Sequence, residues 1–192
     1  MTGRTHDLAA FTALNIVFVT HPPPQMTIAT VIAALGANMI GGLLPDIDNA
    51  TADIWDKVRG GRVIGHLIQP LIGSHRMISH SIFGLAIIGY LLKNIILPVI
   101  GTVILVDMNI IFDALMIGYI SHLVVDSFTT QGIPLFFPIP VRIGFPPNKH
   151  LRIKTGGLLE KILIFPGLLF INGYLIYTNY QFYEIFLRSY LK

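Results

Sequence analysis

The sequence predicts an all-α integral membrane protein, a bundle of about four to five helices. Only 12% of its 192 residues are charged, whereas a soluble domain carries about 25%, and the mean hydropathy is +0.69. This charge is too little to cover a globular surface with water-compatible groups, so lipid must be part of the solvent. The chain has no cysteine, which excludes disulfides and thiolate metal sites. We therefore expect a single membrane-embedded domain over residues 1–192.

The overall charge is compatible with a membrane surface. A net charge of +3 and a pI near 9.3 suit contact with anionic lipid headgroups and are too weak to predict nucleic-acid binding. The N-terminus has a positive charge ahead of an apolar stretch, as a signal peptide would. It lacks a small-x-small cleavage site before its prolines, so we expect it to be retained.

The first half of the chain predicts two helices. Residues 7–20 are apolar but would form a helix only about 21 Å long, too short to cross the hydrocarbon comfortably. The prolines at 22–24 end this helix. Residues 26–44 are uncharged and long enough to span the membrane, and their many alanines and glycines would let a neighbouring helix approach closely.

The second half predicts three further spans. Residues 81–106 are apolar but contain Lys93 and Pro98, which allows one kinked span or a short span followed by a re-entrant piece. Residues 108–130 form a third long apolar segment, and residues 158–177 a final one. The aromatic tail that follows is typical of the interfacial belt of a membrane protein.

The order of spans and loops predicts where the polar side chains gather. Alternating spans would place the loops 45–80 and 132–157 on the same side of the membrane as the N-terminus. Both loops are rich in Lys and Arg, so this side is expected to be cytoplasmic, in a multi-pass protein of the inner (cytoplasmic) membrane. The same topology collects these titratable residues at that face: His6, Asp46, Asp48, His75, His80, His122 and Asp126.

The segment SHLVVD carries the strongest single signal for chemistry. His122 and Asp126 are four residues apart within an apolar segment, which places them one turn apart on one helix face. Polar groups inside a span are costly and indicate function by default. The alternative is a His–Asp hydrogen bond that ties two helices together.

Two loop segments supply further candidate ligands. After Pro45 ends its helix, Asp46 and Asp48 can address one site, and their oxygens suit hard or borderline cations. The alternative is a solvated Asp-rich turn.

The segment HRMISH supplies His75, Arg76 and His80, with Ser79 or Ser81 as the N-cap of the next helix. The alternative here is an interfacial loop that contacts lipid headgroups. Imidazole and carboxylate ligands together suit zinc, and also manganese or iron(II). We therefore favour a metal site over a purely structural network.

Four motifs in this order resemble a known membrane family. They are RTH at 4–6, GGLLPDID at 41–48, SHRMISHS at 74–81 and GYISHLVVDSFTTQGIPLFFP at 118–138. Together they resemble the predicted inner-membrane metal-dependent hydrolases of the YdjM-like, LexA-binding group. That group looks like a distant relative of the zinc-dependent phospholipase C and P1-type nuclease superfamily, whose soluble members hydrolyse phosphoesters at a polynuclear zinc site. The resemblance implies a helical core of that kind.

The resemblance also implies roles for individual residues. Carried over motif by motif, it gives these metal ligands: His6, Asp46, His80, His122 and Asp126. His75 and Asp48 match further motif positions of the membrane family, as additional or supporting ligands. The soluble enzymes have a downstream His-x-x-x-Glu pair that is missing here, since His150 and Glu160 are ten residues apart. One or two metals are therefore expected rather than three.

The function expected from the sequence is a membrane-bound metal-dependent hydrolase that acts on a phosphoester or lipid-like substrate at the cytoplasmic face. Asp48 is the candidate general base. Arg76 is the candidate holder of an anionic headgroup, with Arg142 or Arg152 more remote. Two alternatives stay open. One is a metal-stabilised scaffold for a soluble protein partner, and the other is a transporter or ion pathway, which predicts polar residues along the depth of the bundle.

Overall fold

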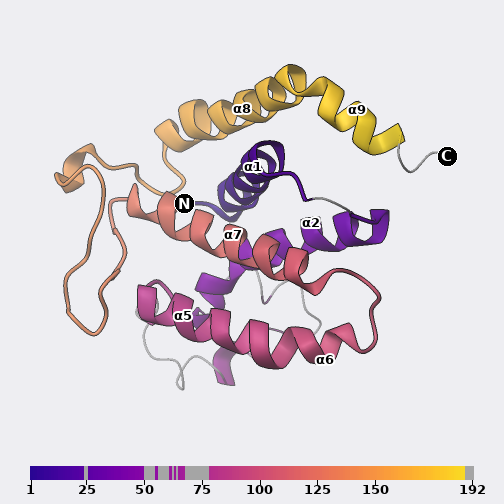
Figure 1. Cartoon of the computed structure of the whole chain (residues 1–192). Helices are drawn as coiled ribbons and strands as arrows, with labels where there is room; N and C mark the ends of the chain where they lie inside the picture. The colour runs from indigo at the N-terminus through magenta and orange to yellow at the C-terminus, as the bar shows by residue number, and fades with distance from the viewer. Residues whose placement is uncertain are drawn as a thin grey trace.

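The computed structural model describes residues 1–23, 26–49, 55, 61, 63, 65–67 and 78–188, and every named element in this part is helical. The α-helices are α1 (Gly3–Thr20), α2 (Ile28–Leu43), α5 (Ile82–Leu91), α6 (Leu97–Gly101), α7 (Met108–Ser127), α8 (Phe165–Thr178) and α9 (Tyr180–Arg188) (Figure 1). Short helical turns are η1 (Leu44–Asp48), η2 (Leu92–Ile96), η3 (Lys149–Leu151) and η4 (Glu160–Ile164). The all-α fold class is confirmed.

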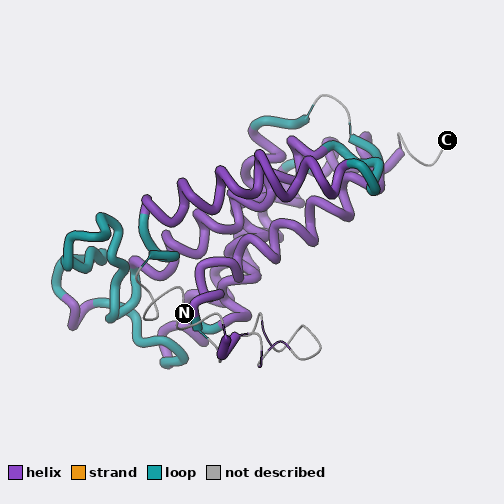
Figure 2. Tube along the Cα trace, turned by 90° about the horizontal axis from the view of Figure 1, so that it is seen from below, coloured by secondary structure: helices purple, strands orange, loops and turns teal. Residues whose placement is uncertain are grey.

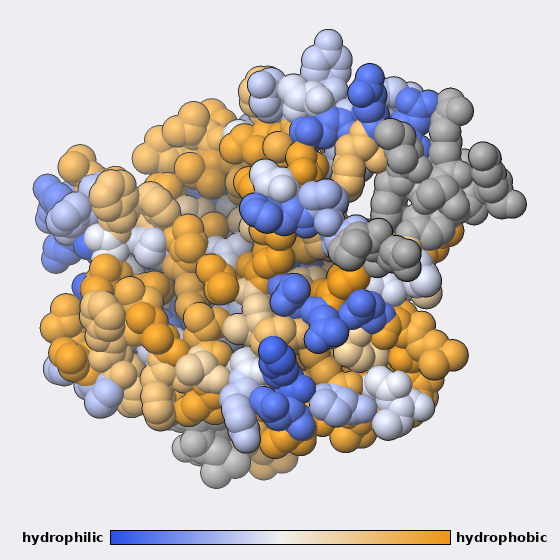
Figure 3. All heavy atoms as spheres, in the orientation of Figure 1, coloured by the Kyte–Doolittle hydropathy of each residue, from blue (hydrophilic) through white to orange (hydrophobic). Residues whose placement is uncertain are grey.

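Four helical stretches are long and apolar enough to cross a membrane: Ile28–Asp48, Ile82–Gly101, Met108–Ser127 and Glu160–Thr178. Residues 81–106, for which the sequence allows either one kinked span or a short span and a re-entrant piece, contain one continuous helical path through α5, η2 and α6. In this path the π-helical turn η2 precedes Pro98. Proline lacks a backbone N–H, so a local change of hydrogen-bond register accommodates it. Figure 2 shows the long helices running roughly side by side, and Figure 3 shows apolar residues over much of the visible helical surface, as a lipid-facing protein requires.

The helix α1 begins at Gly3, four residues before the predicted start. The polar residues Arg4, His6 and Asp7 conceal this first turn from a reading based on apolar runs. Because α1 extends to Gly3, His6 lies within the first turns of a helix.

Helices α2 and α7 touch through their backbones. A Cβ atom added to Gly41 would lie 2.1 Å from the carbonyl oxygen of Leu115, and one added to Gly118 would lie 2.1 Å from that of Asn38. Glycines at such a crossing remove the side chains that would keep two helices apart. The Asn38 side chain adds a hydrogen bond to the Ala114 carbonyl oxygen (3.1 Å). Helix α1 packs on both, with Ala10 against Gly42.

The remaining helices surround this inner group of α1, α2 and α7. Helices α5 and α6 pack on α7, whereas α8 packs on α1. In Figure 1, α8 and α9 lie above α1, and α5 and α6 lie on the opposite side of α7. Successive long helices run in opposite directions, so the start of α1, the end of α2, the start of α5 and the end of α7 meet at one end of the bundle.

Candidate metal centre

Five of the predicted ligands meet at this end of the bundle. They come from α1 (His6), η1 (Asp46), the turn before α5 (His80) and the last turns of α7 (His122 and Asp126). They form two groups, His6–His122–Asp126 and Asp46–His80–His122, and within each group the ligand atoms lie within 4.8 Å of one another. His122 belongs to both groups and is the centre of the cluster.

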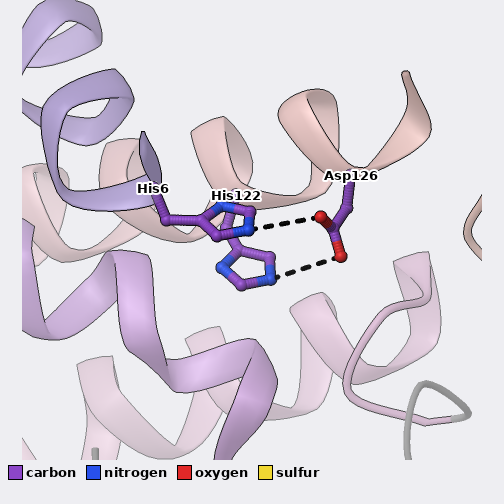
Figure 4. Close-up of side chains that lie close together, drawn as sticks. All are labelled: His6, His122 and Asp126. Carbon is purple, nitrogen blue, oxygen red and sulfur yellow. Dashed lines mark ion pairs between the residues drawn. The ribbon is translucent and has the colours of Figure 1, made fainter. Parts of the chain in front are cut away.

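The distances between ligand atoms fit a shared cation. Nε2 of His6 lies 3.2 Å from Oδ1 of Asp126, and Nε2 of His122 lies 3.7 Å from Oδ2 of Asp126 (Figure 4). Nε2 of His80 lies 3.7 Å from the same Oδ2 and 3.5 Å from Oδ1 of Asp46. With metal–ligand bonds of about 2.1 Å, tetrahedral ligands are roughly 3.4 Å apart. Most of these separations are near that value and longer than a good hydrogen bond.

The hydrogen bond on the other side of the His122 ring defines its tautomer. Nδ1 of His122 donates to the carbonyl oxygen of Gly42 at 2.6 Å, so the proton is on Nδ1 and Nε2 carries a lone pair. Among the described residues this buried Nε2 has no hydrogen-bond partner. It faces the carboxylate oxygens of Asp46 and Asp126, each 3.7 Å away. A lone pair facing two anions is unfavourable without a cation between them, so the residues fit a metal.

His80 is oriented in the same way by a chain of two hydrogen bonds. The hydroxyl of Ser79 donates to Oδ2 of Asp48 (2.6 Å), so its oxygen accepts from Nδ1 of His80 (3.1 Å). The lone pair of His80 Nε2 therefore points at Asp46 and Asp126. The hydroxyl of Tyr119 on α7 donates to the Ser79 carbonyl oxygen and supports this turn.

The rings of His6 and His122 stack, with centroids 3.7 Å apart and planes 9° from parallel. Burial, reinforced by the neighbouring His122, lowers the pKa of His6 to about 3, so His6 is neutral near pH 7, as metal ligation requires. The α-amino nitrogen of Met1 lies 2.6 Å from Oδ1 of Asp126 and 3.0 Å from Nε2 of His6. The site thus places a positive charge next to its most buried carboxylate.

The remaining predicted residues take different places. Asp48 is linked to the cluster through Ser79, whose hydroxyl donates to its fully buried carboxylate. His75 and Arg76 lie outside the described residues. His150 is exposed in η3. Glu160 is buried at the start of η4, where it accepts hydrogen bonds from Thr2, Thr5 and Gly156.

Sequence reasoning missed most of the groups that support the ligands. The sequence predicts Ser79 or Ser81 as a helix cap, and the cap of α5 is Ser81, whose hydroxyl accepts from the Gly84 amide (3.0 Å). Tyr119 was not singled out, although its spacing of three residues before His122 places it on the same helix face. The role of the Gly42 carbonyl has no signal in the residue type, because it depends on how α2 crosses α7.

Comparisons with known proteins agree with the membrane architecture. A family described as YdjM inner membrane protein matches residues 1–187. A protein of Bacillus subtilis (strain 168) named Uncharacterized protein YvsG is 32% identical over 189 residues, with 97% of each chain covered. No solved structure matches the chain. The predicted inner-membrane location is confirmed by the family and by the four candidate spans. The likeness to phospholipase C and P1 nucleases stays a prediction. From its motifs, its spans and this match, the chain belongs to the YdjM inner membrane protein family.

Proposed function

We propose that this protein is a membrane-bound metal-dependent hydrolase that cleaves a phosphoester or lipid-like substrate at the cytoplasmic face. The observation that carries the proposal is the buried Nε2 of His122, whose lone pair faces two carboxylates. A purely structural His–Asp pair would direct an N–H at the carboxylate, whereas a metal site needs the lone pair there.

The five clustered residues would hold one divalent cation or two. Their imidazole and carboxylate donors suit zinc best, and also manganese or iron(II). When bound, such a cation supplies Lewis-acid chemistry that activates water near neutral pH.

The partly exposed side chain of Asp46 marks the open side of the site. The side chain of Asp46 is 26% exposed, whereas those of the other four ligands are 2% exposed or less. Water and substrate would therefore reach the cluster past Asp46, just after the C-terminal end of α2. This position, next to the ends of four helices, is close to the depth of lipid headgroups.

Asp48 is better placed to orient a ligand than to accept a proton from water. Its buried carboxylate holds the Ser79 hydroxyl, which in turn fixes the ring of His80. Such contacts behind a ligand set its tautomer and raise its basicity. Arg76 stays our candidate for holding an anionic substrate, outside the described residues.

The places of the charged residues Lys93 and Asp113 favour the enzyme over an ion pathway. Lys93 and Asp113 are exposed on the outside of their helices, and the Lys93 amine lies 5.3 Å from the centre of the Phe112 ring. Neither residue continues the cluster of ligands through the interior, as a proton relay would require.

The test is metal analysis and hydrolysis on the purified protein in nanodiscs. We expect a bound transition metal and chelator-sensitive hydrolysis of bis-p-nitrophenyl phosphate or of phospholipid. His122→Ala and Asp126→Ala should still insert in the membrane but lose metal and activity, while His150→Ala, outside the cluster, should keep both. Unchanged metal content in both ligand variants would refute the site. Metal that depends on the site without any hydrolysis would favour the scaffold for a soluble protein partner.

A further inference from the structure

We propose that the charged patch formed by η2 and the first turns of α7 is the contact surface between two copies of this chain in the membrane. In such a dimer, Lys93 of each copy pairs with Asp113 of the other. The proposal does not depend on the hydrolase, because Asp113 lies nine residues before His122, about 14 Å away along α7.

Lys93 and Asp113 are charged side chains inside two candidate spans, Ile82–Gly101 and Met108–Ser127. Lys93 lies about 12 Å along its helix from the Gly101 end, and Asp113 about 8 Å from the Met108 end. Both side chains are exposed on the outside of the bundle. Charged groups in a span almost always face protein or a water-filled cavity, because exposure to hydrocarbon is costly. A second protein surface is therefore expected to cover them.

The two charges share a depth but do not neutralise each other within the chain. The amine of Lys93 lies 5.3 Å from the centre of the ring of Phe112, the residue before Asp113. Successive residues of a helix point about 100° apart, so Asp113 lies farther around α7 than the ring that Lys93 covers. Among the described residues, no ion pair includes Lys93 or Asp113. Each charge is thus available to a group outside the chain.

Two side-chain amides extend the charged patch. Asn94 follows Lys93, and Asn109 lies one turn before Asp113 on the same face of α7; both are exposed. One N–H of Asn94 donates to the Tyr90 carbonyl oxygen (2.9 Å), which leaves its second N–H and its oxygen for a neighbour. In Figure 3, hydrophilic residues interrupt the apolar surface in the part of the visible face where Figure 1 shows α7 and the α5–α6 path. Amides of this kind form hydrogen bonds between helices in membranes.

A second copy of the chain is the occupant that complements this patch. In a two-fold interface both copies use the same patch, so residue i contacts residue j and j contacts i. Two copies inserted in the same orientation are related by an axis along the membrane normal, which keeps every residue at its own depth. Because Lys93 and Asp113 share a depth, they can pair twice across this axis. Lipid alone would leave the Asp113 carboxylate facing hydrocarbon.

Charge reversal tests the dimer. The chain has no cysteine, so His150→Cys in the exposed η3 turn supplies one site for a fluorophore. In dilute liposomes the labelled chain should bleach mainly in two steps. Lys93→Asp and Asp113→Lys place like charges on both sides of the interface, so each alone should lower the dimer fraction at least fivefold with unchanged α-helical circular dichroism. Lys161→Asp is the matched control, because it reverses an exposed charge on η4, and should keep the dimer.

Mixing the two variants distinguishes a pair between chains from a pair within one chain. In a mixed dimer of Lys93→Asp with Asp113→Lys, every contact joins a carboxylate to an amine. Co-expression under two affinity tags should therefore restore co-purification to at least half of the unmodified level, which also shows that both variants fold. If either variant fails to insert, Lys93→Met and Asp113→Asn remove the charges alone and should still lower the dimer fraction.

Three results would overturn the proposal. One is a monomeric unmodified chain, in which lipid or a different protein covers the patch. Another is a dimer fraction that neither charge reversal nor charge removal lowers. The third is a failure of the two folded charge-reversal variants to associate when they are co-expressed.

Discussion

Helices α7 and α8 look alike in sequence but differ in their place in the bundle. The candidate spans that contain them, Met108–Ser127 and Glu160–Thr178, have similar mean hydropathies of 1.6 and 1.4. In the most apolar part of each span, however, 44% of the first and only 6% of the second is buried inside the bundle. Helix α7 carries Gly118 at a backbone crossing and two of the candidate ligands, His122 and Asp126. Helix α8 carries none of the clustered residues. Hydropathy identifies a span, whereas small residues and buried ionisable groups identify the span at the centre.

The two helices are also held by different forces. Helix α7 meets α2 through direct backbone contact, which depends on the absence of side chains. Helix α8 is tied to α1 by side-chain amides: Asn172 donates to the hydroxyl of Thr12 (2.7 Å) and accepts from Asn15 (2.9 Å). Interhelical hydrogen bonds in membranes contribute about 0.6 kcal/mol on average. Substitutions on α7 should therefore have larger effects than substitutions on α8.

The largest expected effect is that of Gly118→Leu. A Cβ atom at Gly118 would overlap the Asn38 carbonyl oxygen, and neither backbone can move without separating α2 from α7. We expect a loss of about 3 kcal/mol or more in the free energy of unfolding, measured by denaturant titration in detergent. The metal should be lost too, since His122 would move away from Gly42. Gly167→Leu on α8 should change the stability by less than about 0.5 kcal/mol. Equal free energies of unfolding for Gly118→Leu and Gly167→Leu would contradict the inference that α7, and not α8, depends on close backbone contact.

The next effect concerns the turn that Tyr119 of α7 supports. Ser79→Ala removes the hydroxyl that links Asp48 to His80, so we expect metal affinity to fall about 10- to 100-fold, measured by competition with a chromophoric chelator. Ser81→Ala is the control. It removes the cap of α5 and should cost about 1 kcal/mol of stability without a comparable loss of metal affinity. Equal metal affinities of the two variants would show that Ser79 does not position His80.

A smaller effect is expected from Tyr119→Phe. The substitution removes the hydroxyl that donates to the Ser79 carbonyl oxygen but keeps the ring in the core. Since this group acts through Ser79 rather than on a ligand, we expect about a tenfold loss of metal affinity, at the lower limit for such supporting contacts. Tyr174→Phe, on the exposed face of α8, should leave the affinity unchanged. A loss of stability with full metal affinity would assign Tyr119 to packing alone.

The smallest effect is that of Asn172→Leu on α8. It removes the amide that joins Thr12 and Asn15, and we expect a loss of about 0.6–1.7 kcal/mol in the free energy of unfolding with normal metal content. Loss of metal in this variant would show that α8 controls the centre more strongly than its contacts indicate.

The sequence predicts the spans and the meeting of the ligands, because both follow from hydrophobic length and the alternation of helix direction. It predicts neither the peripheral place of α8 nor the supporting contacts of His122 and His80. The acceptor for His122 is a backbone carbonyl, and its position depends on two glycines that let helices cross at close range. From the sequence, Ser79 is interpreted as a possible helix cap, and only the fold shows that its hydroxyl joins Asp48 to His80.

The hydrogen bonds of Glu160 have a consequence for biosynthesis. The carboxylate at the start of the last span holds Thr5, next to the ligand His6, across a separation of 155 residues. At a translation rate of about 5–20 residues per second, roughly 8–30 s pass between the synthesis of these two residues. The first helix therefore gains this anchor only after the start of the last span has been synthesised. On this order of events, the ligands His6, Asp46, His80, His122 and Asp126 are all synthesised before the carboxylate that anchors the first turn of α1.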